Sequence, residues 1–97
     1  MASSAPAVVE IYSDLPIHPG EFLAEELRAR GMTQRALADL LGRPAQAISE
    51  IVNGKKRITA ATALGLERVL GTPARAWLNL QVEYDLTIAR KAAPSSA

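Results

Sequence analysis

The stretch TQRALADLLGRPAQAISEIVNG, residues 33–54, decides the expected fold. Its first half predicts a short helix, because Thr33 is a favourable N-cap and Gly42 is a residue type that commonly ends a helix. Three leucines spaced three and four residues apart are expected to share its buried face: Leu37, Leu40 and Leu41.

The second half predicts another short helix, which Pro44 opens and Asn53-Gly54 closes, since both closing residues tolerate the left-handed conformation. At about 100° per residue, its apolar residues form one stripe: Ile48, Ile51 and Val52. Its polar residues fall on the other side: Gln46, Ser49, Glu50 and Asn53. Two short helices joined by a glycine-containing turn indicate a helix-turn-helix, whose second helix can enter a DNA major groove.

The polar side of the second helix carries residue types suited to reading bases. Gln46 can donate to and accept from adenine, and Ser49 can bond to several base edges. Ala45 can meet a thymine methyl, and Arg43 can reach guanine or phosphate. We predict base contacts for these four residues. Glu50 has two interpretations: it accepts from a cytosine amine, or it sits aside paired with a cation.

Phosphate contacts are expected on both sides of this unit. Thr33 and Gln34 lie at the start of the first helix, where N-terminal amides favour anions. The run Lys55-Lys56-Arg57 leaves the second helix and is placed to flank the groove. Residue spacing alone leaves a helical module that binds no DNA as an open alternative, because the same geometry occurs in such bundles and a short basic run can be a solvated loop.

The flanking sequence predicts further helices before and after this unit. The first helix begins at Pro19-Gly20-Glu21 and ends at Gly31. Its apolar side is expected to comprise Phe22, Leu23 and Leu27. A later helix is capped by Thr59 and ends at Gly71, with a buried stripe expected at Ala63, Leu66 and Leu70. Gly65 inside it should cost about 1 kcal/mol relative to alanine.

The last helix is expected to start at Thr72-Pro73 and to run to about Ala92. The fold class is therefore an all-α bundle of five helices. Residues 1–17 are expected to be a flexible N-terminal arm, residues 18–92 the helix-turn-helix domain with its long C-terminal helix, and residues 93–97 a disordered tail.

The composition excludes several classes of function. The chain has 97 residues, no cysteine and one histidine, so it offers no disulfide, no thiolate metal site and no convincing catalytic set. We expect no enzyme, no cofactor and no small-molecule substrate, and structural roles for His18 and Trp77. No apolar run approaches the ~18 residues of a membrane span, and the first residues do not look like a signal peptide. A cytoplasmic protein with no membrane partner is expected.

Two sets of residues resemble known families. The pattern from Thr33 to Gly54 resembles the Cro/C1-type (lambda-repressor-like) helix-turn-helix. A wider set is similar to the HigA family of addiction-module antitoxins: His18-Pro19-Gly20-Glu21, Glu50 to Lys55, Ile58-Thr59-Ala60, Trp77 to Gln81 and Tyr84-Asp85-Leu86. This resemblance implies a dimer that represses its own operon by binding operator DNA and neutralises a RelE/HigB-like ribonuclease toxin. A stand-alone repressor without a toxin is the alternative. Many members carry arginine at the positions of Ala45 and Ala47.

The last helix has two apolar stripes with Gln81 and Asp85 between them. One comprises Trp77, Leu80, Tyr84 and Ile88 and can cover the core. The other comprises Leu78, Val82, Leu86 and Ala89, and we predict that it forms a homodimer interface. Such a dimer would hold two recognition helices roughly 34 Å apart. The alternative is that both stripes are buried within one chain.

Toxin contact is predicted from charge. A ribonuclease that grips RNA should be basic, so an acidic docking surface is expected on the first helix at Glu21, Glu25 and Glu26. A solvated helix face is the alternative for these glutamates. The segment from Val8 to Tyr12 could also add a strand to the edge of the toxin's sheet.

Overall fold

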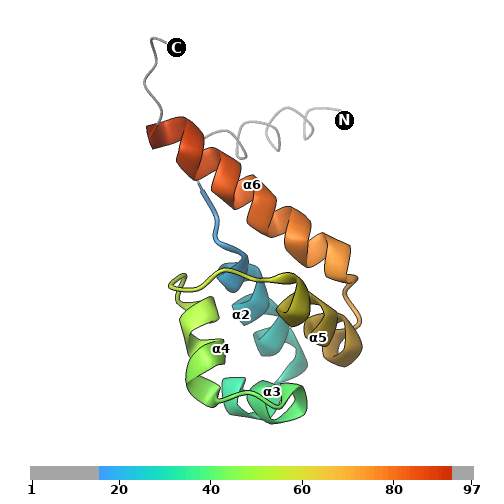
Figure 1. The fold of residues 1–97 in the computed structure, drawn as a ribbon. Coiled ribbons are helices and arrows are strands. Elements are labelled where there is room, and N and C mark those ends of the chain that lie inside the picture. The colour runs from blue at the N-terminus through green and yellow to red at the C-terminus, as the bar shows by residue number, and fades with distance from the viewer. Residues whose placement is uncertain (1–15, 93–97) are drawn as a thin grey trace, which may run out of the picture.

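The computed structural model describes residues 16–92, which form helices and no strand (Figure 1). The helices are α2 (Pro19–Arg30), α3 (Gln34–Leu41), α4 (Ala45–Val52), α5 (Ala60–Leu70) and α6 (Ala74–Ala92). The prediction of an all-α, five-helix fold is confirmed. The predicted C-terminal tail lies outside the described residues, as does the predicted N-terminal arm with its strand-forming segment, apart from Pro16 and Ile17.

The helix ends follow the local sequence. The Thr33 hydroxyl accepts from the backbone N–H of Ala36 at 3.0 Å, and the Thr59 hydroxyl accepts from that of Thr62 at 3.3 Å. Three helices end at glycines in the left-handed conformation, as expected: Gly31, Gly42 and Gly71. After α4 the left-handed residue is Gly54, whereas Asn53 keeps a φ of −88°. Short-range signals therefore suffice to place these boundaries.

The N-terminus of α2 packs on the C-terminal end of α4. The Nδ1 atom of His18 accepts from the backbone N–H of Gly20 at 2.9 Å and caps α2. A Cβ added at Gly20 would lie 1.9 Å from the carbonyl oxygen of Ile51. Only a residue without a side chain allows this approach, so Gly20 permits the close contact between α2 and α4.

The core is formed by apolar residues from every helix and the loop before α5: Leu23, Leu27, Leu37, Ala38, Ile48, Ile51, Ile58, Ala63, Leu66, Leu70 and Trp77. Two residues expected in it are exposed instead, Phe22 at 38% and Leu40 at 53%. The buried arc of α3 is centred between Leu37 and Ala38, and about 100° per residue then turns Leu40 outward. Phe22 is turned away from Leu23 in the same manner.

Close packing also joins α5 to its neighbours. A Cβ added at Gly65 would come within 2.8 Å of the Leu41 side chain, so the small residue brings α3 close to α5. The guanidinium of Arg30 donates to the carbonyl of Leu70 at 2.6 Å and links α2 to the end of α5. Gly65 is thus a packing position as well as a weak point in its own helix.

Helices α2 to α5 form the body of the molecule. Helix α6 lies across this body and extends beyond it (Figure 1). Its first half is attached by Trp77 and Gln81, which are 1% and 2% exposed. Gln81 was predicted to lie between two apolar stripes, but it faces the body. Ile88, on the same side as Trp77, is 41% exposed because the helix has by then left the body. None of the five helices has both the length and the hydrophobicity to cross a bilayer.

Candidate nucleic-acid interface

Helices α3 and α4, with the turn from Gly42 to Pro44, form the helix-turn-helix. Ile48 and Ile51 are 0% and 3% exposed and hold α4 against the body. Because these two residues fix the rotation of α4, its opposite side is presented to solvent. Gln46 is exposed on that side, and Ser49 is partly exposed. The predicted division of α4 into a buried and an open face is confirmed.

A shallow hollow on this face collects most of the predicted DNA-contacting residues. It is lined by Gln34, Ala45, Gln46, Ser49, Glu50, Asn53 and Lys55. Three predicted base-reading residues and two predicted phosphate contacts thus meet there from α3, α4 and the following loop. Asn53 lies in the same lining but was not predicted as a contact. Its place four residues after Ser49, one helical turn along the same face, was the signal for it.

Hydrogen bonds along α4 order this face. The Gln46 side-chain amide donates to the Glu50 carboxylate at 3.4 Å, and the Asn53 amide donates to the Ser49 hydroxyl at 3.2 Å. Both bonds join residues four apart, and both are exposed. Since exposed hydrogen bonds contribute little net stability, they can be exchanged for bonds to base edges at low cost. Among residues 16–92 no donor bonds to the side-chain carbonyl oxygen of Gln46, and Ser49 keeps a hydroxyl proton that it can donate.

Glu50 pairs with a cation, as in the second of its two interpretations. One carboxylate oxygen lies 3.7 Å from the Lys56 ammonium group, and the other accepts from Gln46. The pair places a compensating positive charge next to the single carboxylate of the hollow. A phosphate that approaches α4 therefore meets Glu50 with its charge partly neutralised.

The structure separates Arg43 from the other predicted base-reading residues. Its guanidinium donates to the hydroxyl of Thr62 at 2.9 Å, and Thr62 is 3% exposed. Arg43 lines a second hollow with Ala61 and Arg68, between the turn and α5. The buried hydroxyl on the first turn of α5 provides the acceptor that draws the side chain there. Sequence reasoning missed it, because Thr62 is distant from Arg43 along the chain.

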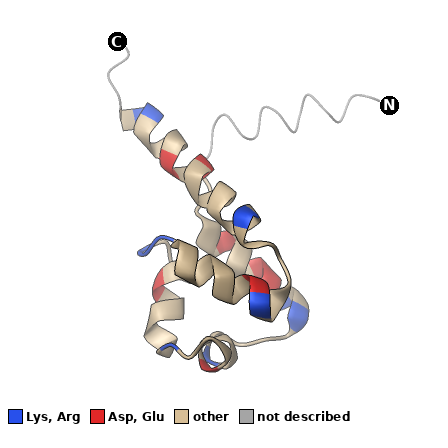
Figure 2. Cartoon of the chain, turned by 45° about the vertical axis from the view of Figure 1, so that its right-hand side comes forward, with Lys and Arg blue, Asp and Glu red and all other residues tan. Residues whose placement is uncertain are grey.

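The loop from Lys55 to Arg57, hereafter the basic loop, is coloured as positive charge beside α4 in Figure 2. Lys55 lines the hollow and Lys56 pairs with Glu50. Arg57 differs from the expectation, because its guanidinium donates to Asp85 of α6 at 2.8 Å. Of the three residues predicted to clamp phosphate, Arg57 is thus turned toward the long helix.

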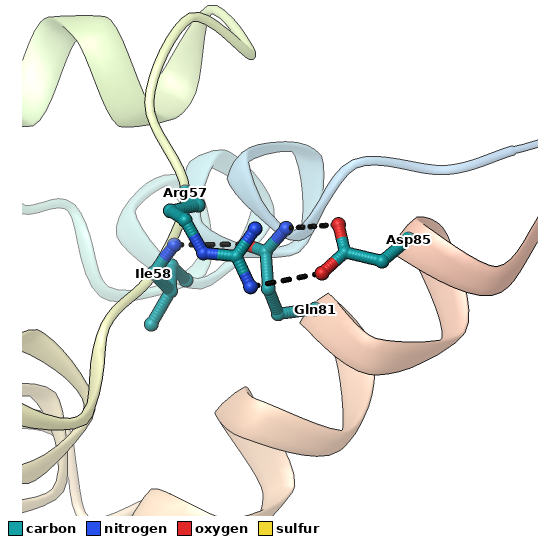
Figure 3. Close-up of polar contacts among 4 residues, drawn as sticks. All are labelled: Arg57, Ile58, Gln81 and Asp85. Atoms are coloured by element: carbon teal, nitrogen blue, oxygen red, sulfur yellow. Dashed lines mark hydrogen bonds and ion pairs between the residues drawn. The ribbon is translucent and has the colours of Figure 1, made fainter. Parts of the chain in front are cut away.

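A chain of hydrogen bonds joins the basic loop to α6 (Figure 3). Gln81 accepts from the backbone N–H of Ile58 at 2.8 Å and donates to Asp85 at 3.0 Å, and Asp85 accepts from Arg57. Burial raises the pKa of the Asp85 carboxyl, but hydrogen bonds from Gln81 and Arg57 outweigh it and the pKa is lowered. Asp85 is therefore held in its charged form.

Comparison with known proteins agrees with this geometry. The helix-turn-helix family matches residues 23–77. Virulence-associated protein I of Dichelobacter nodosus is 47% identical over 76 residues, which cover 77% of this chain and 70% of that protein. A HigA-family addiction module antidote protein from Coxiella burnetii has a TM-score of 0.75 at 48% identity, covering 78% of this chain and 84% of that one. This chain belongs to the HigA family.

A further HigA structure was solved with DNA. The antitoxin HigA of Pseudomonas aeruginosa, determined with the higBA promoter, has a TM-score of 0.77 at 40% identity, covering 80% of this chain and 86% of that one. The Cro/C1-type helix-turn-helix of this chain is thus shared with proteins of the HigA family.

In this HigA-family chain, the second stripe of α6 is largely open. Val82 is 49% exposed and Leu86 is 40% exposed, and Ala89 is exposed as well. Leu78 is half-buried because it also packs against the core. Among residues 16–92 nothing buries Val82, Leu86 or Ala89, so the alternative in which both stripes are buried within one chain is not met in that part of the chain. The open face runs from Val82 toward the end of α6.

The acidic residues of α2 are partly neutralised by their own helix. Glu25 pairs with Arg28 at 2.6 Å and Glu26 pairs with Arg30 at 2.9 Å, whereas Glu21 is exposed in the first turn. Intrahelical pairing of this kind is typical of a solvated helix face. It reduces the net negative charge that α2 can present to a basic partner.

His18 is a structural residue, as expected. Burial lowers its pKa, although the Asp85 and Glu21 carboxylates act to raise it. Its ring meets that of Tyr84 edge-on, with centroids 4.8 Å apart, and so joins the start of α2 to α6. Within residues 16–92 no cluster of three or more His, Asp or Glu side chains is arranged to hold a metal ion.

Proposed function

We propose that this chain is a dimeric antitoxin that binds operator DNA in its own promoter, represses its operon, and neutralises a RelE/HigB-like ribonuclease toxin. The observation that carries the proposal is the hollow on α4, where Ala45, Gln46 and Ser49 meet Gln34 and Lys55 on one exposed face. Membership of a family with a structure solved on promoter DNA supports it.

The DNA contact divides into two kinds. Gln46 and Ser49 offer donors and acceptors to base edges, and Ala45 offers a methyl group. Gln34 and Lys55 lie at the rim of the same hollow and suit backbone phosphates. Thr33 keeps a hydroxyl proton that can be donated to phosphate while its oxygen caps α3. Lys56 reaches phosphate once it leaves Glu50, whereas Arg43 is held by Thr62 and is a weaker candidate.

The experiment that tests DNA binding is a salt series with duplex DNA from directly upstream of the gene and an unrelated duplex of equal length. Wild type should prefer the promoter duplex, and Gln46→Ala/Ser49→Ala should lose that preference and keep weak, salt-sensitive binding through phosphates. Asn79→Ala, an exposed amide on α6, is the matched control and should bind as wild type does. No preference by wild type at any salt concentration would refute sequence-specific binding.

Dimerisation is proposed through the open stripe of α6. Val82, Leu86 and Ala89 present an apolar surface on a helix that extends beyond the body, which suits a two-fold contact with a second copy, and Leu78 extends this surface toward the core. Val82→Glu/Leu86→Glu should sediment as a monomer and bind promoter DNA more weakly. A double variant that remains dimeric would exclude this interface.

Toxin binding is tested separately. Reversing Glu21 and Glu25 to lysine should weaken binding of a basic ribonuclease toxin encoded beside this gene, if α2 docks it through charge. Glu83→Lys, which reverses the charge of an exposed carboxylate on α6, is the control. Equal toxin affinity for the two variants would exclude the α2 surface, and Glu26 with it. A chain that binds the promoter but no neighbouring gene product would be a stand-alone repressor.

A further inference from the structure

The cations of the basic loop differ in what holds them. The Lys56 ammonium and the Glu50 carboxylate are 3.7 Å apart, a long contact between an exposed lysine and a partly buried glutamate. Arg57 donates to Asp85 at 2.8 Å, which is the length of a strong charge-assisted hydrogen bond. Lys55 has no carboxylate within ion-pair distance in residues 16–92 and lies at the hollow. The three positive charges are therefore not equally available to a DNA phosphate.

The Asp85 carboxylate is oriented from the interior. Gln81 is 2% exposed, and its carbonyl oxygen is committed to the buried backbone N–H of Ile58. Its NH₂ group must then point along α6 to one oxygen of Asp85, which leaves the other oxygen for Arg57 (Figure 3). Because a buried amide fixes the carboxylate, the ion pair needs little further ordering of Asp85.

From this geometry we propose that Asp85 acts as a tethered competitor of DNA phosphate for Arg57, which keeps Arg57 out of the DNA contact and sets the affinity for DNA. The inference rests on the proposed DNA binding. A carboxylate and a phosphate offer similar oxygens to a guanidinium. Asp85 has the advantage of being part of the same chain and already in position.

The competition predicts a specific pattern in DNA binding. Each cation that neutralises a phosphate adds about 0.9 to the slope of log K against log salt. Arg57→Ala should therefore leave the wild-type slope unchanged. Asp85→Asn keeps the shape of the side chain and an acceptor for Gln81, but frees Arg57. It should raise affinity roughly threefold, the scale of an exposed ion pair, and steepen the slope by about 0.9.

The experiment measures promoter DNA binding across a salt series for wild type, Asp85→Asn, Arg57→Ala and the double variant. Glu83→Gln is the control, because it removes one exposed carboxylate from α6 that is not bonded to Arg57. The proposal predicts that the double variant loses the gain of Asp85→Asn and that Glu83→Gln changes the slope little. Thermal melts establish that each variant is folded.

The outcomes separate the two proposals. If Asp85→Asn and Glu83→Gln raise affinity equally, or if Asp85→Asn has the same effect without Arg57, the competition is overturned while DNA binding stands. A salt-dependence slope for Arg57→Ala that is shallower than that of wild type would also overturn it, since Arg57 would then already contact phosphate in wild type. If neither wild type nor any variant binds promoter DNA at low salt, the proposed function fails and this inference fails with it.

Discussion

The body formed by α2 to α5 and the long helix α6 are held by different kinds of contact. The body is joined by apolar side chains and by the close approach of α2 to α4 at Gly20. The first turns of helix α6 are attached by Trp77, with Leu78 and Leu80 beside it, and the next turns by polar contacts through Gln81 and Asp85. The body should therefore be sensitive to added volume, whereas the attachment of α6 should be sensitive to hydrogen bonding and charge.

The largest effect is expected from Gly20→Ala. The new Cβ would overlap the carbonyl of Ile51, and backbone atoms cannot rotate away as a side chain can. We expect a loss of about 3 kcal/mol in the free energy of unfolding, the upper range for overpacking. Urea unfolding at one fixed chain concentration measures it, because dimerisation would couple stability to concentration. An unchanged midpoint would contradict the tight contact between α2 and α4.

A smaller loss is expected from Gln81→Leu, which tests the attachment of α6. The substitution leaves the buried backbone N–H of Ile58 without its acceptor, at a cost of about 2 kcal/mol. Asn79→Leu makes a comparable change at an exposed amide of the same helix and should cost much less. Equal midpoints in urea for the two variants would mean that the Gln81 amide contributes nothing to holding α6.

The cap at His18 should make stability depend on pH. Folding lowers the pKa of His18, mainly through burial, so the unfolded chain binds the proton more readily. Protonation of His18 therefore leaves the free energy of unfolding unchanged above the ordinary histidine pKa of about 6.5 and lowers it as the pH drops below that value. His18→Asn keeps a capping side chain that does not titrate and should flatten this part of the profile. Unfolding midpoints from pH 7.5 to 5 would test it, and parallel profiles would exclude His18 as the cause.

The smallest effect is expected from Gly65→Ala, the counterpart of Gly20→Ala. Alanine should gain up to about 1 kcal/mol of helix propensity, but its Cβ must displace the end of the half-buried Leu41 side chain. Because that side chain can rotate, the two terms should nearly cancel, to within about 0.5 kcal/mol. A loss as large as that of Gly20→Ala would show that the contact between α3 and α5 is as rigid as that between α2 and α4.

The buried sides of short helices were predictable only in part. Leu37 and Leu41 lie inward as their spacing indicated, but Leu40 does not. A helix of eight residues buries an arc, and its neighbours decide where the arc is centred. Ile88 illustrates the same limit on α6. Its side of the helix is buried at Trp77 but exposed about three turns further along, where α6 has left the other helices.

The positions of long cationic side chains were the least predictable feature of the candidate site. Arg43 and Arg57 follow short elements in a pattern that suits DNA contacts, and both are bonded to residues remote in sequence, Thr62 and Asp85. A flexible guanidinium takes the best acceptor within reach, and which acceptors are within reach depends on how the helices pack. Gln46 and Ser49 are shorter than arginine and bond to residues four positions further along the same face, so they stay on the face where α4 puts them.

The amino-acid sequence by itself determined the elements of this protein and which face of α4 is open to solvent, because capping residues, glycines and the helical repeat act over a few residues. The family relationship follows from the same residues. Only the tertiary structure decided that Gly20 is a contact between two helices, that Gln81 is buried, and that Asp85 holds Arg57. Those contacts join segments distant along the chain, and they exist only once the helices have packed.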